Sequence, residues 1–175
     1  MSMNALLIEQ EAADAKLAFA VHQNSSLRHI RLVRAKIAST LRPETFNTPL
    51  EIDFQFKSKQ LETGPEVLRL LVLFRMTGKI RESESPLVSV ESDYEADYQL
   101  GEGFALTPEA ARAFKDGNAI FNMWPYFREY LQSSLQRMGL PPLTAPFLRL
   151  QPKTPKRAGK DTPPLKPSAT ERVPD

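Results

Sequence analysis

The side chains that could do chemistry fall into two groups, and the first is a row of carboxylates. Glu91, Asp93, Glu95 and Asp97 occupy alternate positions, so in a β-strand they would share one face about 6.5–7 Å apart. Three uses fit such a row: ion pairs across neighbouring strands, docking of a basic partner, or a divalent cation or glycosidase-like carboxylate pair. The cations that could pair with it are Arg69, Arg75, Lys79 and Arg81.

The second group is aromatic and lies between Ile120 and Leu131. Five of the ten residues from Phe121 to Tyr130 are aromatic. A helix here packs partly on a sheet, but this content exceeds what one sheet face requires. The surplus favours a subunit interface or a groove that binds something apolar. The apolar residues predicted for such binding are Phe104, Phe121, Met123, Trp124, Tyr126, Phe127, Tyr130 and Phe147.

Few residues are suited to catalysis or cofactor binding. Cysteine is absent, and the only two histidines, His22 and His29, have no third ligand motif beside them. The seven glycines are scattered and form no phosphate-binding loop. We therefore predict that the protein is not an enzyme, binds no metal and needs no cofactor.

The charge and hydrophobicity of the chain limit its partners and its compartment. Lys and Arg number 23 against 21 acidic residues, which argues against nucleic acid as a partner of the whole chain. The opening lacks the basic start and apolar run of a signal peptide, and no stretch is apolar over the roughly 20 residues of a spanning helix. We expect a cytoplasmic protein without membrane insertion.

The elements that position these groups follow from hydrophobic periodicity. Apolar residues alternate with polar ones in three segments, which predicts an antiparallel meander of strands over residues 50–57, 67–79 and 88–100. Residues 27–40 suit either a helix or a strand, and residues 4–22 predict an N-terminal helix.

The sequence after the sheet predicts helices. Thr107-Pro108 is a helix start, and Asp116-Gly117-Asn118 predicts the stop of a short first helix. A second, aromatic helix should run to Met138 before Gly139, with a kink or late start at Pro125.

The C-terminal segment, residues 151–175, has six prolines and six basic residues with almost nothing apolar. That composition predicts a disordered tail. The expected organisation is an N-terminal helical extension over residues 1–24, a domain over residues 25–150, and the tail.

Two motifs in the helical part resemble the SecB export chaperones. Asn118-Ala119-Ile120-Phe121 followed by Trp124-Pro125-Tyr126-Phe127-Arg128-Glu129 resembles the Pro-Asn-Ile-Leu-Phe-Pro-Tyr-Ala-Arg-Glu stretch of that family. The segment from Gly139 to Phe147 resembles its Gly-Thr-Phe-Pro-Gln-Leu-Asn-Leu-Ala-Pro segment. The resemblance extends over residues 27–148 and makes residues 27–38 the first of four strands.

The resemblance implies an α+β fold, a four-stranded antiparallel sheet with helices packed on one face, assembled as a dimer or tetramer. It also implies an ATP-independent holdase that binds non-native polypeptides, its clients, in an apolar groove, which makes the apolar residues named above the predicted client-binding residues. In such proteins an acidic sheet surface docks the SecA motor during export, which would give Glu91 and Asp93 that role, whereas some relatives protect an antitoxin of a toxin–antitoxin system. Two features differ from the family: the chain has no room for a full second helix before Pro152, and its tail is basic rather than acidic.

Overall fold

A computed structural model describes residues 5–81, 83 and 85–153. The four long strands alternate with polar connections and precede the main helices. In chain order the elements are β1 (Leu6–Gln10), α1 (Ala12–Gln23), β2 (Ser25–Ser39), a 3₁₀ turn (Pro43–Thr45), β3 (Glu51–Thr63), β4 (Val67–Lys79), β5 (Val88–Leu100), α2 (Pro108–Phe114), a π turn (Lys115–Ala119), α3 (Ile120–Arg137) and β6 (Leu148–Pro152). The α+β prediction is confirmed.

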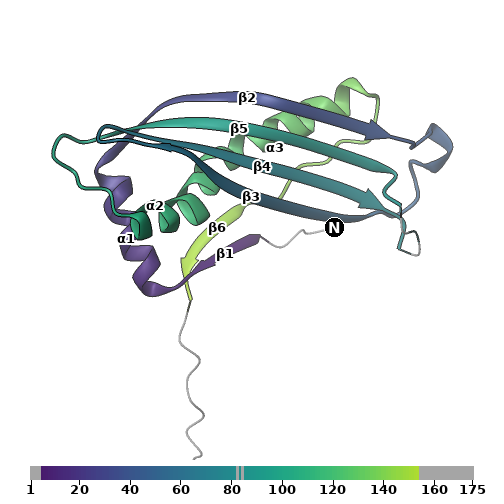
Figure 1. Ribbon diagram of the computed structural model, residues 1–175. Helices are drawn as coiled ribbons and strands as arrows, with labels where there is room; N and C mark the ends of the chain where they lie inside the picture. Colours follow the sequence, from purple (N-terminus) through teal and green to yellow (C-terminus); the bar gives the residue numbers. More distant parts are fainter. Residues whose placement is uncertain (1–4, 82, 84, 154–175) are drawn as a thin grey trace, which may run out of the picture.

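The main sheet has the strand order β2-β5-β4-β3, with every neighbouring pair antiparallel. Residues 27–38, which the periodicity left ambiguous, lie in β2. Because side chains alternate across a strand, β4 and β5 each present an apolar row to the helices. Figure 1 shows α2 and α3 on one face of this sheet, and the other face is uncovered in the described part of the chain. The predicted four-stranded sheet with helices on one face is confirmed.

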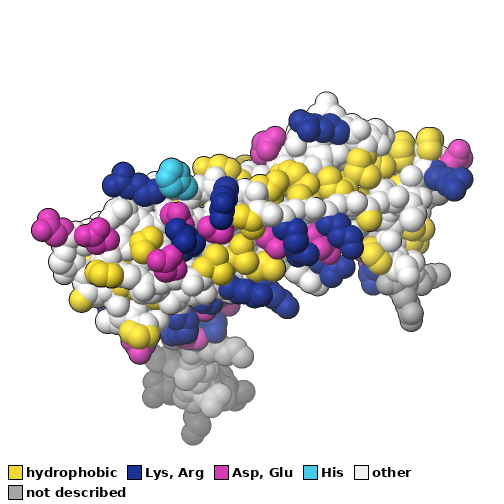
Figure 2. Space-filling view, turned by 45° about the horizontal axis from the view of Figure 1, so that its top comes forward, with side chains coloured by type: hydrophobic (Ala, Val, Ile, Leu, Met, Phe, Trp, Pro, Cys, Tyr) yellow, Lys and Arg dark blue, Asp and Glu magenta, His cyan; other side chains and the backbone are white. Residues whose placement is uncertain are grey.

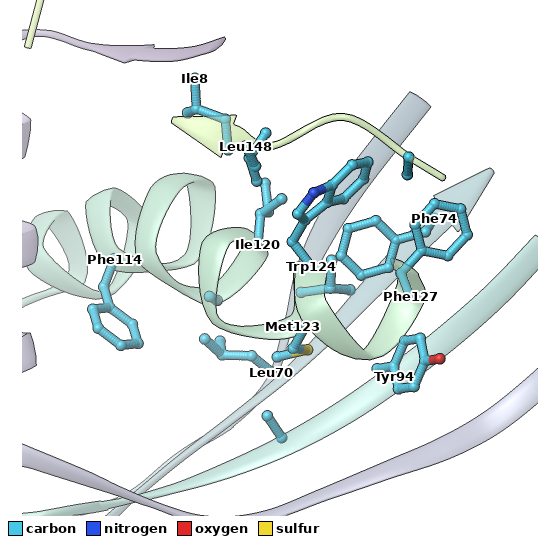
Figure 3. Close-up of a cluster of buried hydrophobic side chains, with 14 of the residues drawn as sticks. Ile8, Leu70, Phe74, Tyr94, Phe114, Ile120, Met123, Trp124, Phe127 and Leu148 are labelled. Carbon is cyan, nitrogen blue, oxygen red and sulfur yellow. The ribbon is translucent and has the colours of Figure 1, made fainter. Parts of the chain in front are cut away.

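The core lies between this apolar face and α3. Phe74 on β4 stacks on Phe127 of α3 with ring centroids 5.0 Å apart, and Trp124 lies 5.3 Å from Phe127 (Figure 3). The Trp124 indole Nε1–H also donates to the Pro146 carbonyl at 3.0 Å. One aromatic cluster thus joins the sheet, the helix and the segment that leads to β6.

The start of the helical part was predicted correctly, but its break was not. Thr107 caps α2, since its hydroxyl accepts a hydrogen bond from the Ala110 amide. The helix does not stop at Gly117, because a π turn joins α2 directly to α3. Gly117 is needed there for space: a Cβ at this position would lie 2.4 Å from the Gln10 Nε2 atom. Pro125 lies inside α3 rather than at its start.

The N-terminal segment is not one long helix. Its first residues form β1, which pairs in parallel with β6 in the register Leu6↔Leu148 to Gln10↔Pro152. Ile8 and Gln10 are buried, and α1 packs against α2, where Arg112 and Asp14 form an ion pair of 2.8 Å. Helix α1 is therefore shorter than predicted, and the segment is built into the same body as the sheet.

The predicted tail lies almost entirely outside the described residues. Gln151 and Pro152 at its start belong to β6 instead, and the Lys153 amide donates to the Gln10 carbonyl at 2.7 Å. None of the helices in the described part of the chain is long and apolar enough to span a membrane.

Candidate functional site

An apolar groove opens at one end of the sheet, between two connecting segments. Its empty space is about 590 Å³, including the open mouth. The groove is lined by residues of the β2–β3 connection, of the sheet and of the segment after α3: Leu41, Phe46, Thr48, Leu50, Ile52, Met76, Val88, Leu135, Leu140, Pro141, Pro142 and Leu143. This lining contains no charged side chain, so the groove suits bulky apolar groups.

One wall of the groove is set by the way α3 ends. Gly139 adopts a positive φ of 69°, the Leu140 amide donates to the Leu135 carbonyl, and the Gly139 amide donates to the Gln136 carbonyl. This pair of bonds is the Schellman ending of a helix. The chain turns back at this point, and Pro141 and Pro142 restrict its backbone. Leu140 and Leu143 are thereby held over the end of the sheet.

The predicted client-binding residues do not form this groove, and three of them are core residues. Met123, Trp124 and Phe127 are buried, because their spacing along α3 directs them at the sheet. In the folded chain as described they pack in the core, and their client-binding role stays a prediction. Phe104 and Tyr130 are half-buried.

Phe121, Tyr126 and Phe147 are the predicted client-binding residues that are exposed, by 44%, 48% and 70% respectively. The Arg128 guanidinium lies over the Phe147 ring, with Cζ of Arg128 4.7 Å from the ring centroid. The Arg128 Nε–H donates to the Ala145 carbonyl at 3.0 Å, which fixes that guanidinium. Exposed aromatic side chains therefore lie on α3, at Phe121 and Tyr126, and beside it, at Phe147.

The predicted carboxylate row lies on the uncovered face of β5, and every member has an arginine within ion-pair distance. The shortest contacts are 3.5 Å for Arg75 to Glu91, 2.7 Å for Arg34 to Asp93, 3.0 Å for Arg31 to Glu95, and 2.6 Å for Arg69 to Asp97. The interpretation as ion pairs across strands describes this geometry.

The partners differ in part from the predicted ones. Arg69 and Arg75 on β4 pair as expected, whereas Arg81 lies 3.6 Å from Glu51. The periodicity did not indicate the cations of β2, because residues 27–40 suited a helix equally well. The hydrogen bond from Arg34 to Asp93 and the charge of that carboxylate raise the pKa of Arg34 above its ordinary value.

The alternative of a divalent-cation site at the carboxylate row is not supported by a cluster of ligands in the described residues. Among the described residues, no three His, Asp or Glu side chains are grouped as metal ligands. His22 lies on α1 and His29 on β2, both exposed.

The arrangement of elements is similar to a solved chaperone structure. The SecB-like chaperone Rv1957 of Mycobacterium tuberculosis, solved with a ChAD peptide from the antitoxin HigA1 (Rv1956), aligns with 78% of this chain and 99% of its own, at a TM-score of 0.67 and 20% identity. This chain has the SecB-like fold. No protein-family model and no curated protein matches the sequence.

A second solved structure covers a similar share of the chain with weaker agreement. A Streptococcus agalactiae protein of unknown function aligns with 70% of this chain and 97% of its own, at 8% identity and a TM-score of 0.45. The SecB-like fold predicted from residues 118–147 is confirmed by the alignment with the chaperone structure, and an apolar groove was predicted, but not the residues that line it. Its signal in the sequence was apolar residues, such as Phe46 and Leu143, within proline-containing connections.

Proposed function

We propose that the protein is an ATP-independent chaperone that binds extended, non-native polypeptide segments in the apolar groove. The observation that carries this proposal is a charge-free hollow, open to solvent, on a SecB-like fold. A folded protein gains stability by closing such a surface, so an open one is typical of a binding site. A holdase needs apolar surface that adapts to many side chains rather than a catalytic pocket, and we propose that the protein catalyses no reaction.

The groove has the size and chemistry for a few apolar side chains of a client. Burying one Leu or Phe side chain contributes about 1.5–3 kcal/mol. Two or three such side chains contribute about 3–9 kcal/mol before the cost of ordering the segment, so the groove alone supports micromolar binding at most. The exposed Tyr126, Phe121 and Phe147 supply further aromatic contacts along α3 for a client that extends beyond the groove.

The alternative function is a dedicated chaperone for one partner, such as an antitoxin. It is favoured by the chaperone of similar fold, which was solved with an antitoxin-derived peptide. Crosslinking followed by a pull-down separates the two proposals. A general holdase gives many crosslinked clients, whereas a dedicated chaperone gives one dominant partner.

Assembly and cellular role are further parts of the proposal. Leu27, Leu32 and Val33 are exposed on β2, which is an edge strand of the sheet. An exposed apolar edge is suited to pairing with a second copy, so we propose a homo-oligomer, a dimer or tetramer, measurable by native mass spectrometry. A cytoplasmic location and a role in export with SecA are also proposals.

The test of client binding in the groove is a substitution at a half-buried residue of the groove wall. Leu143→Glu places a charge in the lining, while Thr144→Glu adds the same charge at the exposed neighbour outside the lining. The probe is reduced and carboxymethylated lactalbumin, a permanently unfolded client, with fluorescence anisotropy as the measurement. Losing the contact of one leucine should cost about 1–2 kcal/mol, or about five- to thirtyfold in affinity.

The two variants separate a groove effect from a change in net charge. We expect Thr144→Glu to bind within about twofold of the natural chain, since an exposed charge contributes little. Client binding that is equal in both variants, with both folded by circular dichroism, would show that the groove is not the site. A folded natural chain that neither binds this client nor suppresses aggregation of a denatured enzyme would remove the holdase function.

A further inference from the structure

The uncovered face of the sheet carries its charges in two layers. The four β5 carboxylate side chains, from Glu91 to Asp97, are only 10–26% exposed, whereas the arginines that pair with them are 37–69% exposed. Solvent and partners therefore meet guanidinium groups first. A guanidinium has five N–H donors, and in Arg31 only Nη2 donates to Glu95, so donors of this layer stay available to an anion.

The strand register repeats one pattern across the middle of this face. Lys57 on β3 lies opposite Leu73, which lies opposite Asp93, which in turn lies opposite Arg34. The next row, two residues along, is Lys59, Leu71, Glu95 and Arg31. Each row thus reads lysine, leucine, carboxylate, arginine. With strands about 4.8 Å apart, the lysine and arginine columns are about 14 Å apart, with the leucines between them.

The lysine column differs from the arginine column because no carboxylate of the described residues pairs with it. Lys57 and Lys59 are exposed and make no ion pair with any residue in the described ranges. Lys57, Leu73 and Arg75 also line a shallow hollow of about 620 Å³ beside Asp93 and Arg34. Figure 2 shows Lys and Arg side chains between the acidic ones, with hydrophobic side chains among them.

We propose that this open face docks an acidic polypeptide segment with apolar residues, and not a basic partner. Carboxylates of the segment would meet Lys57 and Lys59, whose spacing of about 6.5–7 Å matches alternate residues of an extended chain. Its apolar side chains would cover Leu71 and Leu73. A basic segment would have to displace an arginine from each carboxylate, which leaves a cation unpaired for every new pair formed.

A polypeptide fits this face better than a nucleic acid does. The lining of the hollow offers leucine and no exposed aromatic ring on which bases could stack. The carboxylates between the leucine and arginine columns would also repel a continuous phosphate backbone. A peptide can place its few carboxylates over the lysines alone.

The test uses three fluorescein-labelled probes with the full chain in fluorescence anisotropy. The first is the peptide Gly-Glu-Leu-Glu-Leu-Glu-Gly, the second has Lys in place of each Glu, and the third is a 12-nucleotide oligothymidylate. We expect the acidic peptide to bind about tenfold more tightly than the basic one at low salt, and more weakly as salt rises.

Two variants test whether the lysine column binds the acidic peptide. K57E/K59E reverses two exposed, unpaired charges, so the fold should persist, and binding of the acidic peptide should fall at least about fivefold. Lys16→Glu, an exposed charge change on α1, should leave it unchanged. Equal or tighter binding of the basic peptide, or an unaffected K57E/K59E variant, would overturn the proposal. Oligothymidylate binding more tightly than the acidic peptide would assign the face to nucleic acid and overturn it as well.

Discussion

Replacing Gly117 with alanine tests the contact between the N-terminal strand and the helical part. Gly117 lies in the π turn between α2 and α3, with the side chain of buried Gln10 against it. The Gln10 Nε2–H donates to the Ala113 carbonyl at 2.7 Å. A methyl group at residue 117 would lie 2.4 Å from Nε2 and 2.6 Å from Cδ of that side chain, so Gln10 has to move.

The magnitude follows from two opposing terms. Gly→Ala inside a helix ordinarily stabilises by about 1 kcal/mol. Here the displaced Gln10 amide loses its buried hydrogen bond, or stays in place and is overpacked, and either outcome costs about 1–3 kcal/mol. We expect Gly117→Ala to lower the free energy of unfolding by about 1 kcal/mol, the difference between these terms.

The assay is urea unfolding monitored by circular dichroism for four proteins: the natural chain, Gly117→Ala, Gln10→Ala and the double variant. Once Gln10 is shortened, the alanine at residue 117 has room and should stabilise as in an ordinary helix. The coupling free energy between the two positions should therefore be about 1–3 kcal/mol. A coupling below about 0.5 kcal/mol, or a Gly117→Ala variant more stable than the natural chain, would refute this account of the π turn.

Two other changes probe the core. Trp124→Phe removes the hydrogen bond from Nε1 to the Pro146 carbonyl and leaves a void, so the free energy of unfolding should fall by about 1–3 kcal/mol. The client affinity of the folded protein, measured by anisotropy, should stay the same. Weakened client binding without lost stability would contradict the assignment of Trp124 to the core. Burial raises the pKa of Tyr98 to about 12, above the value near 10 of an unfolded chain. The contribution of Tyr98 to stability is therefore present below about pH 10 and is lost as pH rises toward 12. In urea unfolding, the free energy of unfolding of Tyr98→Phe should fall less between about pH 8 and about pH 11 than that of the natural chain. An equal fall in both proteins would contradict the burial effect.

The sheet could be predicted because its signal is local and periodic. Each of β3, β4 and β5 alternates apolar and polar residues on its own, so no partner is needed to recognise it. Strand β1 lacked such a signal. Its five residues, Leu6 to Gln10, pair with a strand whose first residue, Leu148, lies more than a hundred positions later in the chain. The neighbouring residues Ala12 to Gln23 favour helix, and a propensity summed over the whole segment extended that helix too far.

The helix break predicted at Gly117 is absent, and three of the predicted client-binding residues are buried, for a shared reason, which is contact between distant segments. Asp116-Gly117-Asn118 has the composition of a stop, but the glycine is explained by the space that Gln10 occupies. Two of the α3 aromatic residues lie in the core because the large rings of Phe74 and Phe54 pack with Trp124 and Phe127. Neither contact is visible in the local sequence.

The groove and the open face of the sheet differ in how they affect the stability of the free chain, and this difference bears on their roles. The open face of the sheet is stable without a partner, because one face of an antiparallel sheet can be solvated when it is polar and its carboxylates are paired with arginines. The groove has no such compensation, since its lining is apolar apart from Thr48 and holds no ion pair among the described residues. Leu143→Glu, at a half-buried position of the groove wall, should then lower client affinity with little loss of stability of the free chain. On the open face, removing Arg34 should destabilise the free chain itself, because it leaves the buried Asp93 without its shortest contact.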